Sequence, residues 1–531
     1  MNKKELGSYY TPQRLANFIA NYCIQKLDKD SISILEPSVG DGSFIEAINI
    51  SPEINNFESV ELEVVERELV ELDKAIQKNN NDAIGLVSNN QDYLLFHSEN
   101  QNKYSLIIGN PPYVKSNLLT DEQKELALQI HLEQNLSDKR INNIWTAFLI
   151  SAISKLEDDG ILAFVLPLEL LQVKFTSEIR ELLKSVFARL EIFMFDELQF
   201  QECKGQDTVL LIAFKEHPAN GTFYTTVSSM DDLENNRFVL QQNITVSESD
   251  KKWTHHFITP DEYSFLENIK AQLNTVKEVV DNKAGIVTAA NDFFIVNEEI
   301  LRRYRLRRYG KPIIRKGFFV NGSVTFNGND FEDLVLQNKP SYLLDFNLAN
   351  PKRLSKGVQK YVQEGELQEL HLRYKCKKRK HWYQVPNIVE QGEAFFFKRA
   401  HEYPKLLKNE ADVHVTDSAY VVKTKDGIEI NDFVYSFYNS LTLAFAELEG
   451  RYYGGGVLEL TPNEFRTLPI PLVQAEDFQS YTSEFKNKSK IEDVLNSHNT
   501  AILNRSLNLS SDEIKKIEFI RRKLIDRRQR K

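Results

Sequence analysis

The feature that most constrains the fold is an alternation of short apolar segments with helical segments between residues 32 and 214. Seven segments rich in aliphatic residues are predicted to be strands, at 32–37, 59–66, 83–88, 104–109, 161–167, 189–195 and 208–214. Residues 142–160 carry apolar side chains at helical spacing, and Gly160 is predicted to end that helix. Such an alternation predicts a doubly wound, mostly parallel α/β sheet of the Rossmann-like kind. Because ligands of these sheets bind at the carboxyl ends of strands, the residues after each strand become candidate site residues.

The charge distribution predicts two halves with different tasks. Residues 1–250 carry 21 Lys and Arg against 39 Asp and Glu, whereas residues 301–400 carry 21 against 9. A chain of 531 residues is also too long for one ordinary core. We therefore predict a catalytic domain at 1–245, a second domain at 246–475 that binds a polyanion, and a C-terminal helical segment at 476–531. Charge alone is explained equally well by a solvated surface.

The first predicted strand is followed by the sequence EPSVGDGSF. Glu36 and Pro37 begin this turn, and its Gly40 and Gly42 lack the side chain that would hinder a sharp bend or the close approach of a ligand. The segment is not a complete G-x-G-x-x-G pattern and holds no phosphate-binding lysine. A simple strand-to-helix turn therefore explains the glycines about as well as a ligand does.

Acidic residues follow the second and third predicted strands. Glu66 stands where an acid accepts hydrogen bonds from ribose hydroxyls. Asp92 is placed to accept a hydrogen bond from an adenine amino group, and Tyr93 beside it to pack on the purine ring. Glu66 by itself is also explained as a solvated residue at the start of a helix, since Glu68 and Glu71 follow it. Together with the glycine turn, these strand-end residues predict a site for an adenosine-containing cofactor.

The fourth predicted strand ends in the sequence GNPPY. Asn110 offers a side-chain carbonyl, and Pro111 offers a main-chain carbonyl without a competing N–H. Pro111 and Pro112 fix their backbone angles, so both acceptors are held rigidly, and Tyr113 adds an aromatic face. Two acceptors beside a ring suit an exocyclic amino group, whose hydrogens would bond to the carbonyls and leave the nitrogen lone pair free for an electrophile. A Pro-Pro turn is the structural alternative, and the three preceding strand ends argue against it.

Taken in order, these motifs resemble those of the DNA adenine-N6 methyltransferases of the gamma motif order, found in Type II restriction-modification systems. NPPY resembles their catalytic motif, and EPSVGDGSF resembles their cofactor loop. GSYYTPQRLANFIA resembles their N-terminal cofactor-binding segment, and in it Thr11 is predicted to cap a helix that has Pro12 in its first turn. FQECKGQDTVLLIAF resembles the later segment whose aromatic residue packs against the extruded base. The resemblance covers about residues 5–215.

The resemblance implies that S-adenosyl-L-methionine is the cofactor and that Tyr10 and Thr11 join the strand-end residues in binding it. The target adenine would be flipped out of the duplex, because its amino group is unreachable inside the stack. Tyr113 and Phe200 would sandwich the base, while the two carbonyl groups of NPPY orient N6. The methyl group would pass directly from sulfur to nitrogen, without a metal or a covalent nucleophile.

Basic clusters beside aromatic residues mark the second half, at 301–319 and 373–386. Phosphate contacts from such clusters supply affinity for nucleic acid, and a few base contacts supply specificity. Segments 285–296 and 451–471 resemble stretches of the target-recognition domains of Type II restriction-modification methyltransferases. We therefore expect a mixed α+β domain that reads duplex DNA, although a solvated surface remains the alternative for each cluster. The predicted DNA-binding residues are Arg315, Lys316, Lys378, Arg379 and Arg451.

The segment 114–141, directly after NPPY, includes the predicted helix LTDEQKELALQIHLEQ. Thr120 and Gln123 occupy capping-box positions at the start of this helix. A helical excursion beside the site could serve as a lid or as a DNA-contacting arm. The role as an arm predicts that its deletion weakens DNA binding while cofactor binding is retained.

Three other functions share parts of this pattern. NPPY also serves enzymes that methylate glutamine amides in proteins or amino groups of RNA bases, but these usually lack a large basic domain. A fused nuclease is not expected, because the catalytic pattern starts near residue 1 and no paired-acid nuclease motif follows it. A DNA-binding protein without catalysis would not need an intact Asn110–Tyr113 turn. We therefore favour a site-specific DNA methyltransferase that acts on adenine N6.

The sequence also predicts the setting in which the chain works. It shows neither the apolar core of a signal peptide nor an apolar run long enough to span a bilayer. Cys23, Cys203 and Cys376 are too far apart in sequence to suggest a metal site or a disulfide framework. We expect a cytoplasmic, DNA-associated monomer without a membrane partner, and a separately encoded cognate restriction endonuclease is a candidate partner.

Overall fold

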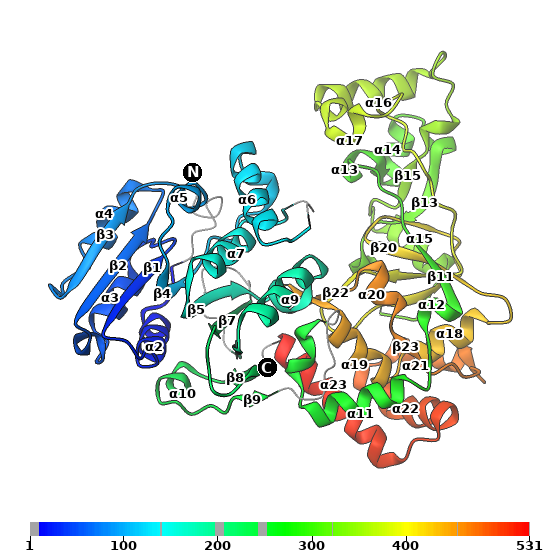
Figure 1. Cartoon of the computed structure of the whole chain (residues 1–531). Helices are drawn as coiled ribbons and strands as arrows, with labels where there is room; N and C mark the ends of the chain where they lie inside the picture. The colour runs from blue at the N-terminus through cyan, green and yellow to red at the C-terminus, as the bar shows by residue number, and fades with distance from the viewer. Residues whose placement is uncertain are drawn as a thin grey trace. The chain divides into compact units, whose positions relative to one another are not determined.

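A computed structural model of the chain describes residues 10–137, 141–196, 207–242, 252–320, 322–453 and 455–529. The chain divides into two compact units (Figure 1). The first comprises Met1–Pro260, Tyr452–Gly456 and Gln529–Lys531, and the second comprises Asp261–Arg451 and Val457–Arg528. Among the described residues, no helix has the length and apolar character needed to cross a membrane.

A single nine-stranded sheet organises the first unit. Its strands are β1 (Ser31–Glu36), β2 (Ser59–Val65), β3 (Ile84–Asn89), β4 (Tyr104–Gly109), β5 (Leu156–Pro167), β6 (Arg189–Phe195), β7 (Thr208–Phe214), β8 (Gly221–Val227) and β9 (Gln241–Gln242). They lie in the order β3-β2-β1-β4-β5-β7-β6-β8-β9. β7 runs antiparallel to β5 and β6, and β9 runs antiparallel to β8, while the other pairs are parallel. The doubly wound α/β prediction is confirmed, and the strand order switches between β1 and β4.

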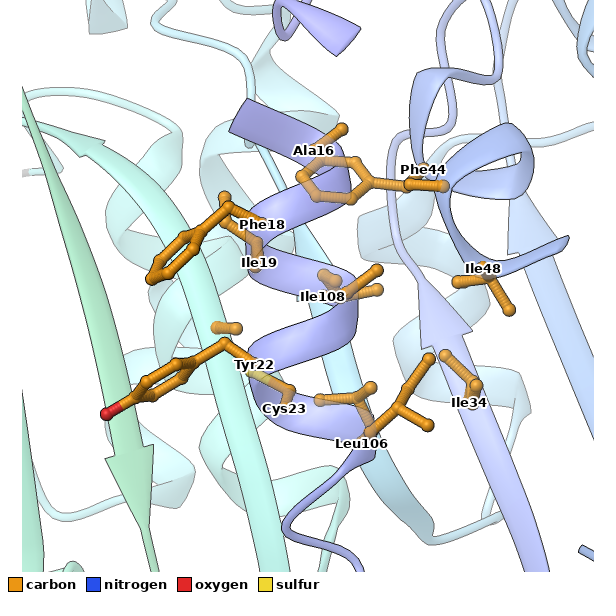
Figure 2. Close-up of a cluster of buried hydrophobic side chains, with 14 of the residues drawn as sticks. Ala16, Phe18, Ile19, Tyr22, Cys23, Ile34, Phe44, Ile48, Leu106 and Ile108 are labelled. Atoms are coloured by element: carbon orange, nitrogen blue, oxygen red, sulfur yellow. The ribbon is translucent and has the colours of Figure 1, made fainter. Parts of the chain in front are cut away.

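Helices cover both faces of this sheet. They are α2 (Gln13–Ile24), α3 (Ser43–Asn49), α4 (Leu69–Ile76), α5 (Tyr93–Glu99), α6 (Asp121–Glu133), α7 (Trp145–Lys155), α8 (Glu169–Gln172), α9 (Ser177–Val186) and α10 (Met230–Glu234). Figure 2 shows α2 against β1 and β4, with Leu106 and Ile108 in the same apolar cluster as Ile19. Ile107 is also fully buried but points to the opposite face, where α7 contacts β5. Burial on both faces explains why β4, β6 and β7 are continuous apolar runs in the sequence.

The helix predicted at 142–160 ends earlier than expected, because α7 stops at Lys155 and β5 begins at Leu156. Leu156 pairs with Tyr104 of β4, and the register then shifts before the ladder resumes. Lys29 forms ion pairs with Glu157 and Asp159 inside this irregular stretch. Apolar spacing did not reveal the boundary, since Leu156 fits both the helical stripe and the strand.

The predicted polar boundary after Asn220 contains a strand that the sequence did not suggest. β8 pairs in parallel with β6 along its whole length. Its Phe223 ring lies 3.7 Å from the guanidinium of Arg189, which covers that side of the strand. β8 is half-exposed near the edge of the sheet, and its run of threonines therefore lacks the apolar signal of a central strand.

The second unit is a mixed α+β structure with several small sheets, which confirms the predicted fold class. A five-stranded sheet has the order β11-β20-β16-β18-β14, a four-stranded sheet has the order β12-β15-β13-β19, and β10 pairs with β23. The strands are β10 (Asn274–Thr275), β11 (Val280–Ala284), β12 (Ile295–Val296), β13 (Gly310–Ile314), β14 (Thr325–Phe326), β15 (Tyr342–Leu344), β16 (Ala394–Phe397), β17 (Arg399–Ala400), β18 (Leu406–Asn409), β19 (His414–Val415), β20 (Ala419–Thr424), β22 (Val457–Glu459) and β23 (Pro469–Ile470). The remaining strand, β21 (Arg451–Tyr453), starts at the last residue of one segment of this unit and continues into residues assigned to the first unit.

Helices complete the second unit. They are α11 (Pro260–Lys270), α12 (Val276–Val279), α13 (Asn291–Phe294), α14 (Glu298–Arg303), α15 (Gly328–Leu336), α16 (Lys356–Leu367), α17 (Tyr374–Lys377), α18 (Ile430–Phe437), α19 (Ser440–Glu449), α20 (Pro462–Arg466), α21 (Phe478–Asn487), α22 (Ile491–Leu507) and α23 (Ser511–Gln529). The basic helix α23 is anchored by Arg521, which is fully buried and pairs with Glu492 at 2.6 Å and Glu518 at 2.8 Å. Part of the basic charge of this helix is therefore neutralised by ion pairs within the second unit.

Candidate functional site

A cavity of about 590 Å³ opens at the carboxyl ends of β1, β2, β3 and β4, at the switch in strand order. Ten residues predicted from the sequence line it: Tyr10, Thr11, Glu36, Pro37, Gly40, Glu66, Asp92, Tyr93, Asn110 and Pro112. Gly42, Pro111 and Tyr113 belong to the same two turns but are not among the residues that line the cavity. The structure thus brings residues from four separate strand ends and the N-terminal segment to one cavity.

The glycine turn after β1 is shaped by close packing on both sides. Gly40 and Gly42 have φ angles of +52° and +81°, in the left-handed region that favours glycine. A Cβ on Gly40 would lie 3.1 Å from the Tyr10 ring, and a Cβ on Gly42 would lie 2.8 Å from the Cα of Ala75 in α4. Gly40 therefore serves the cavity, whereas Gly42 serves the packing of the turn against a helix.

The N-terminal segment reaches the cavity through Tyr10 and Thr11. The Tyr10 hydroxyl donates to Glu71 of α4 at 2.8 Å, which fixes its ring beside Gly40. The predicted capping role of Thr11 is wrong, because α2 begins at Gln13 with Pro12 in the N-cap position and no side-chain cap. Pro12 has an extended backbone there, so Thr11 stays outside the helix and is buried in the cavity wall.

Glu66 fastens the end of β2 to the glycine turn. Its Oε2 accepts a hydrogen bond from the Gly40 N–H at 3.1 Å, and its Oε1 accepts one from the Glu68 N–H at 3.0 Å. Each carboxylate oxygen has a second acceptor position. Glu66 therefore holds the turn in place and can still accept a hydrogen bond from a ligand hydroxyl.

Glu36 carries a buried carboxyl with an unsatisfied oxygen. The residue is 1% exposed, and its Oε2 has no hydrogen-bond partner among the described residues. Burial raises the pKa of this carboxyl well above its ordinary value, and the carboxylates of Asp41 and Glu66 raise it further. Because an unpaired buried acid is costly, this corner of the cavity favours a cationic ligand group.

Aromatic rings form the wall beyond β3. Tyr93 is 3% exposed, and its ring lies 4.7 Å from that of Phe148 of α7. The Tyr93 hydroxyl is hydrogen-bonded to the Ser151 hydroxyl at 2.8 Å, which fixes the orientation of the Tyr93 ring. Asp92 caps α5 by accepting from the Leu94 N–H at 2.9 Å, and it also lines the cavity. An acid beside two rings is the arrangement that a purine with an amino group would require.

The NPPY turn presents its asparagine to the cavity. The Tyr113 hydroxyl donates to the side-chain oxygen of Asn110 at 2.9 Å, and the Ser38 hydroxyl donates to the Asn110 main-chain oxygen at 3.3 Å. Tyr113 is only 8% exposed, so its ring is part of the turn rather than an open platform in this structure. Pro37 fixes the turn from the other side, because a Cβ on Gly109 would lie 3.4 Å from its ring.

Several cavity residues were missed by the sequence analysis. They are Ser38, Val39, Asp41, Ser43, Phe44, Val65, Arg67, Glu68, Gln91, Val114, Leu118, Leu119, Thr120, Gln123, Ile144 and Phe148. Ile144 and Phe148 belonged to the apolar stripe of the predicted helix at 142–160, and that spacing gave no sign of a cavity. Thr120 and Gln123 were recognised as a capping box, which the structure confirms, but not as part of the cavity wall. Phe200 lies outside the described residues.

The three predicted DNA-binding arginines make contacts inside the second unit. Arg315 pairs with Asp292 at 2.6 Å, and Arg451 pairs with Glu464 at 2.9 Å. Arg379 is half-buried and donates to main-chain oxygens at 2.6 and 3.2 Å. These contacts give each arginine a structural function.

The two predicted lysines are exposed beside exposed aromatic rings. The ammonium of Lys316 lies 5.5 Å from the ring of Phe318, which is 69% exposed. The ammonium of Lys378 lies 4.2 Å from the ring of Tyr374, which is 72% exposed. A cation beside an exposed ring offers both phosphate and base contacts to a nucleic acid.

Two family models match most of the chain. Residues 23–200 match the Eco57I restriction-modification methylase model, and residues 250–503 match the C-terminal domain of Type II methyltransferase M.Eco57I. The chain is 24% identical over 485 residues to Type II methyltransferase M.AccI from Acinetobacter calcoaceticus, with 87% of this chain and 85% of that protein covered.

A second relative and a solved structure agree with this match. The chain is 24% identical over 346 residues to Type II methyltransferase M.BanIII from Aneurinibacillus aneurinilyticus, which covers 56% of this chain and 59% of that protein. The fold is shared with the Type IIL restriction-modification enzyme MmeI, at a TM-score of 0.59 and 12% identity, over 93% of this chain and 73% of that chain. The chain belongs to the Eco57I family of Type II restriction-modification methyltransferases.

Proposed function

We propose that this chain transfers a methyl group from S-adenosyl-L-methionine to the N6 amino group of a flipped-out adenine in duplex DNA, as the modification enzyme of a restriction-modification system in the cytoplasm. The observation that carries the proposal is that Asn110 of NPPY opens on the same cavity as the acids that follow β1, β2 and β3. A turn that can bind an amino group and a set of acids that can bind a nucleoside therefore line the same cavity.

The residues of the cavity fit the cofactor group by group. The unpaired Glu36 carboxyl suits the positively charged amino group of its methionine part. The free acceptor positions of Glu66 suit ribose hydroxyls, and Asp92 suits the adenine amino group, with Tyr93 and Phe148 beside the purine. When bound, the cofactor supplies an electrophilic methyl group.

The chain's own contribution to the reaction is to hold the target amino group. The side-chain oxygen of Asn110 and the main-chain oxygen of Pro111 would each accept one of its hydrogens, which turns the nitrogen lone pair away from the base ring. Tyr113 keeps the Asn110 side chain oriented through its hydroxyl. When N6 gains the methyl group, it must release one of these two hydrogens as a proton to solvent. Catalysis of this kind depends on positioning rather than on a covalent intermediate.

Duplex DNA is proposed as the substrate because of the second unit. Residues 301–400 are strongly basic, and Lys316 and Lys378 stand exposed beside aromatic rings. The structure of MmeI, which shares the fold, was determined in complex with DNA. In this proposal residues 1–245 carry catalysis, 246–475 recognise the target sequence, and 476–531 support the recognition domain.

The test incubates the chain with labelled S-adenosyl-L-methionine and, separately, duplex DNA, RNA or protein extract. Label recovered as N6-methyladenine in DNA supports the proposal, and label confined to RNA or protein refutes it. Asn110→Ala should abolish methylation yet retain cofactor binding, measured by calorimetry. Asn102→Ala, on the exposed approach to the opposite end of β4, is the matched control and should leave activity unchanged.

A further inference from the structure

The excursion after NPPY is a closed loop that borders the cofactor cavity. It leaves and returns at one place, where the Ile144 N–H donates to the Val114 oxygen at 2.9 Å and the Ser116 N–H donates to the Asn142 oxygen at 3.0 Å. Its residues Leu118, Leu119, Thr120 and Gln123 line the cavity. The excursion therefore contributes a wall to the first unit's cavity.

Helix α6 of the excursion is fixed against its neighbours. Its buried residues are Ala127 and Ile130. His131 is hydrogen-bonded to Thr146 of α7 at 3.2 Å, and Glu133 is hydrogen-bonded to His97 of α5 at 3.0 Å. Contacts to two helices of the sheet layer set the position of the first turn of α6 at the cavity.

The side chain of Gln123 is held at both ends of its amide. Its Oε1 accepts from the Thr120 N–H at 3.2 Å, as part of the capping box, so its amino group is turned the other way. That amino group donates to Oδ2 of Asp92 at 2.7 Å. The other oxygen of Asp92 accepts from the Leu94 N–H at 2.9 Å. Both oxygens of the Asp92 carboxylate are thereby fixed, and each keeps a second acceptor position.

We propose that Gln123 is a positioning residue for the cofactor base, which orients the Asp92 carboxylate so that it accepts the 6-amino group of adenine and rejects a 6-oxo purine. The inference rests on the proposed function, because it names the part of the cofactor that Asp92 reads. A carboxylate accepts hydrogen bonds only, so an oxo group would face it with a lone pair instead of a donor. The excursion is then part of the cofactor site rather than a DNA-contacting arm.

The test compares two ligands that differ only at position 6 of the purine: S-adenosylhomocysteine, the product of the cofactor, and its 6-oxo analogue S-inosylhomocysteine. Their affinities for the full chain are measured by calorimetry. The wild type should prefer the adenine form by about 10- to 100-fold, as expected for a hydrogen bond to a charged group. Gln123→Ala should weaken the binding of S-adenosylhomocysteine by about tenfold and leave the affinity for S-inosylhomocysteine nearly unchanged. The preference for the adenine form over the inosine form should therefore fall.

Two further variants separate positioning from packing. Gln123→Met keeps the volume of the side chain but loses the amide, and it should reproduce the loss of preference. Gln129→Ala, on an exposed position of the same helix, should retain the wild-type preference. A Gln123 variant that weakens the binding of both ligands equally, or of neither, would overturn the inference. A wild-type chain that binds both ligands equally would also overturn it. A wild-type chain that prefers the adenine form but transfers no label to DNA would refute the proposed substrate and leave this inference standing.

Discussion

The Tyr113 hydroxyl and the Asn110 side-chain oxygen are joined by a hydrogen bond of 2.9 Å across three residues of one turn. The same hydroxyl lies 3.1 Å from the main-chain oxygen of Val165 in β5. The tyrosine therefore ties the proposed amino-group acceptor to the neighbouring strand. Its hydroxyl gives the turn a second function beyond the aromatic face that the sequence predicts.

Tyr113→Phe should lower kcat for methylation by about tenfold while leaving cofactor affinity unchanged, because it releases the Asn110 side chain without emptying the cavity. Steady-state kinetics with labelled cofactor and calorimetry measure the two quantities. Tyr104→Phe is the matched control, since it removes a buried hydroxyl 2.7 Å from Glu63 at the opposite end of β4. A similar fall in kcat for both variants would assign the effect to stability.

Glu36→Gln should raise the free energy of unfolding at neutral pH, because the amide carries no charge that must be buried. Burial raises the pKa of Glu36 in the folded state, so above pH 4.5 the folded chain retains a proton that the unfolded chain loses. Stability is therefore lost as pH rises through this window, and the gain of the variant should shrink toward pH 4.5. Urea unfolding of both proteins at several pH values measures this difference in the free energy of unfolding.

The same substitution should weaken S-adenosylhomocysteine binding, since Gln cannot pair with a cationic amino group. Glu61→Gln is an exposed control on β2 and should change neither property. A more stable variant with unchanged ligand affinity would show that Glu36 does not contact the cofactor.

Gly42→Ala should destabilise the first unit by about 1–3 kcal/mol, because a Cβ at φ +81° would lie 2.8 Å from the Cα of Ala75. Gly85→Ala in β3 is the control, since its nearest contact would be 3.6 Å and its φ is not positive. Urea unfolding followed by circular dichroism compares the two. Equal effects would contradict the packing function of Gly42.

Lys316→Ala and Lys378→Ala should each weaken DNA binding at low salt and reduce the slope of log affinity against log salt by about one. Lys515→Ala is the control, because Lys515 is an exposed lysine of α23 already near Asp512. Fluorescence anisotropy with a duplex at several salt concentrations measures the slopes. Unchanged slopes for both lysines would place the DNA-binding surface elsewhere.

The strand pattern and the NPPY turn could be read from the sequence because their signals are local. Apolar runs of four to eight residues bounded by turns predict strands, and two prolines fix the backbone of Asn110 wherever the turn lies. β8 was missed because its burial depends on its place beside β6, and its own residues are half polar. The end of α7 was misplaced because Leu156 pairs with a residue 52 positions earlier in the chain.

The sequence by itself determined the α/β alternation, the family motifs and the chemistry of the strand-end residues, since each depends on residue types within a few positions. Only the tertiary structure decided that Gln123 meets Asp92, 31 residues away, and that Phe148 faces the cavity beside Tyr93. It also decided that Arg521 is buried and that Lys316 is exposed. The physical reason is that side-chain partners are set by the packing of whole helices against the sheet, which no local pattern encodes.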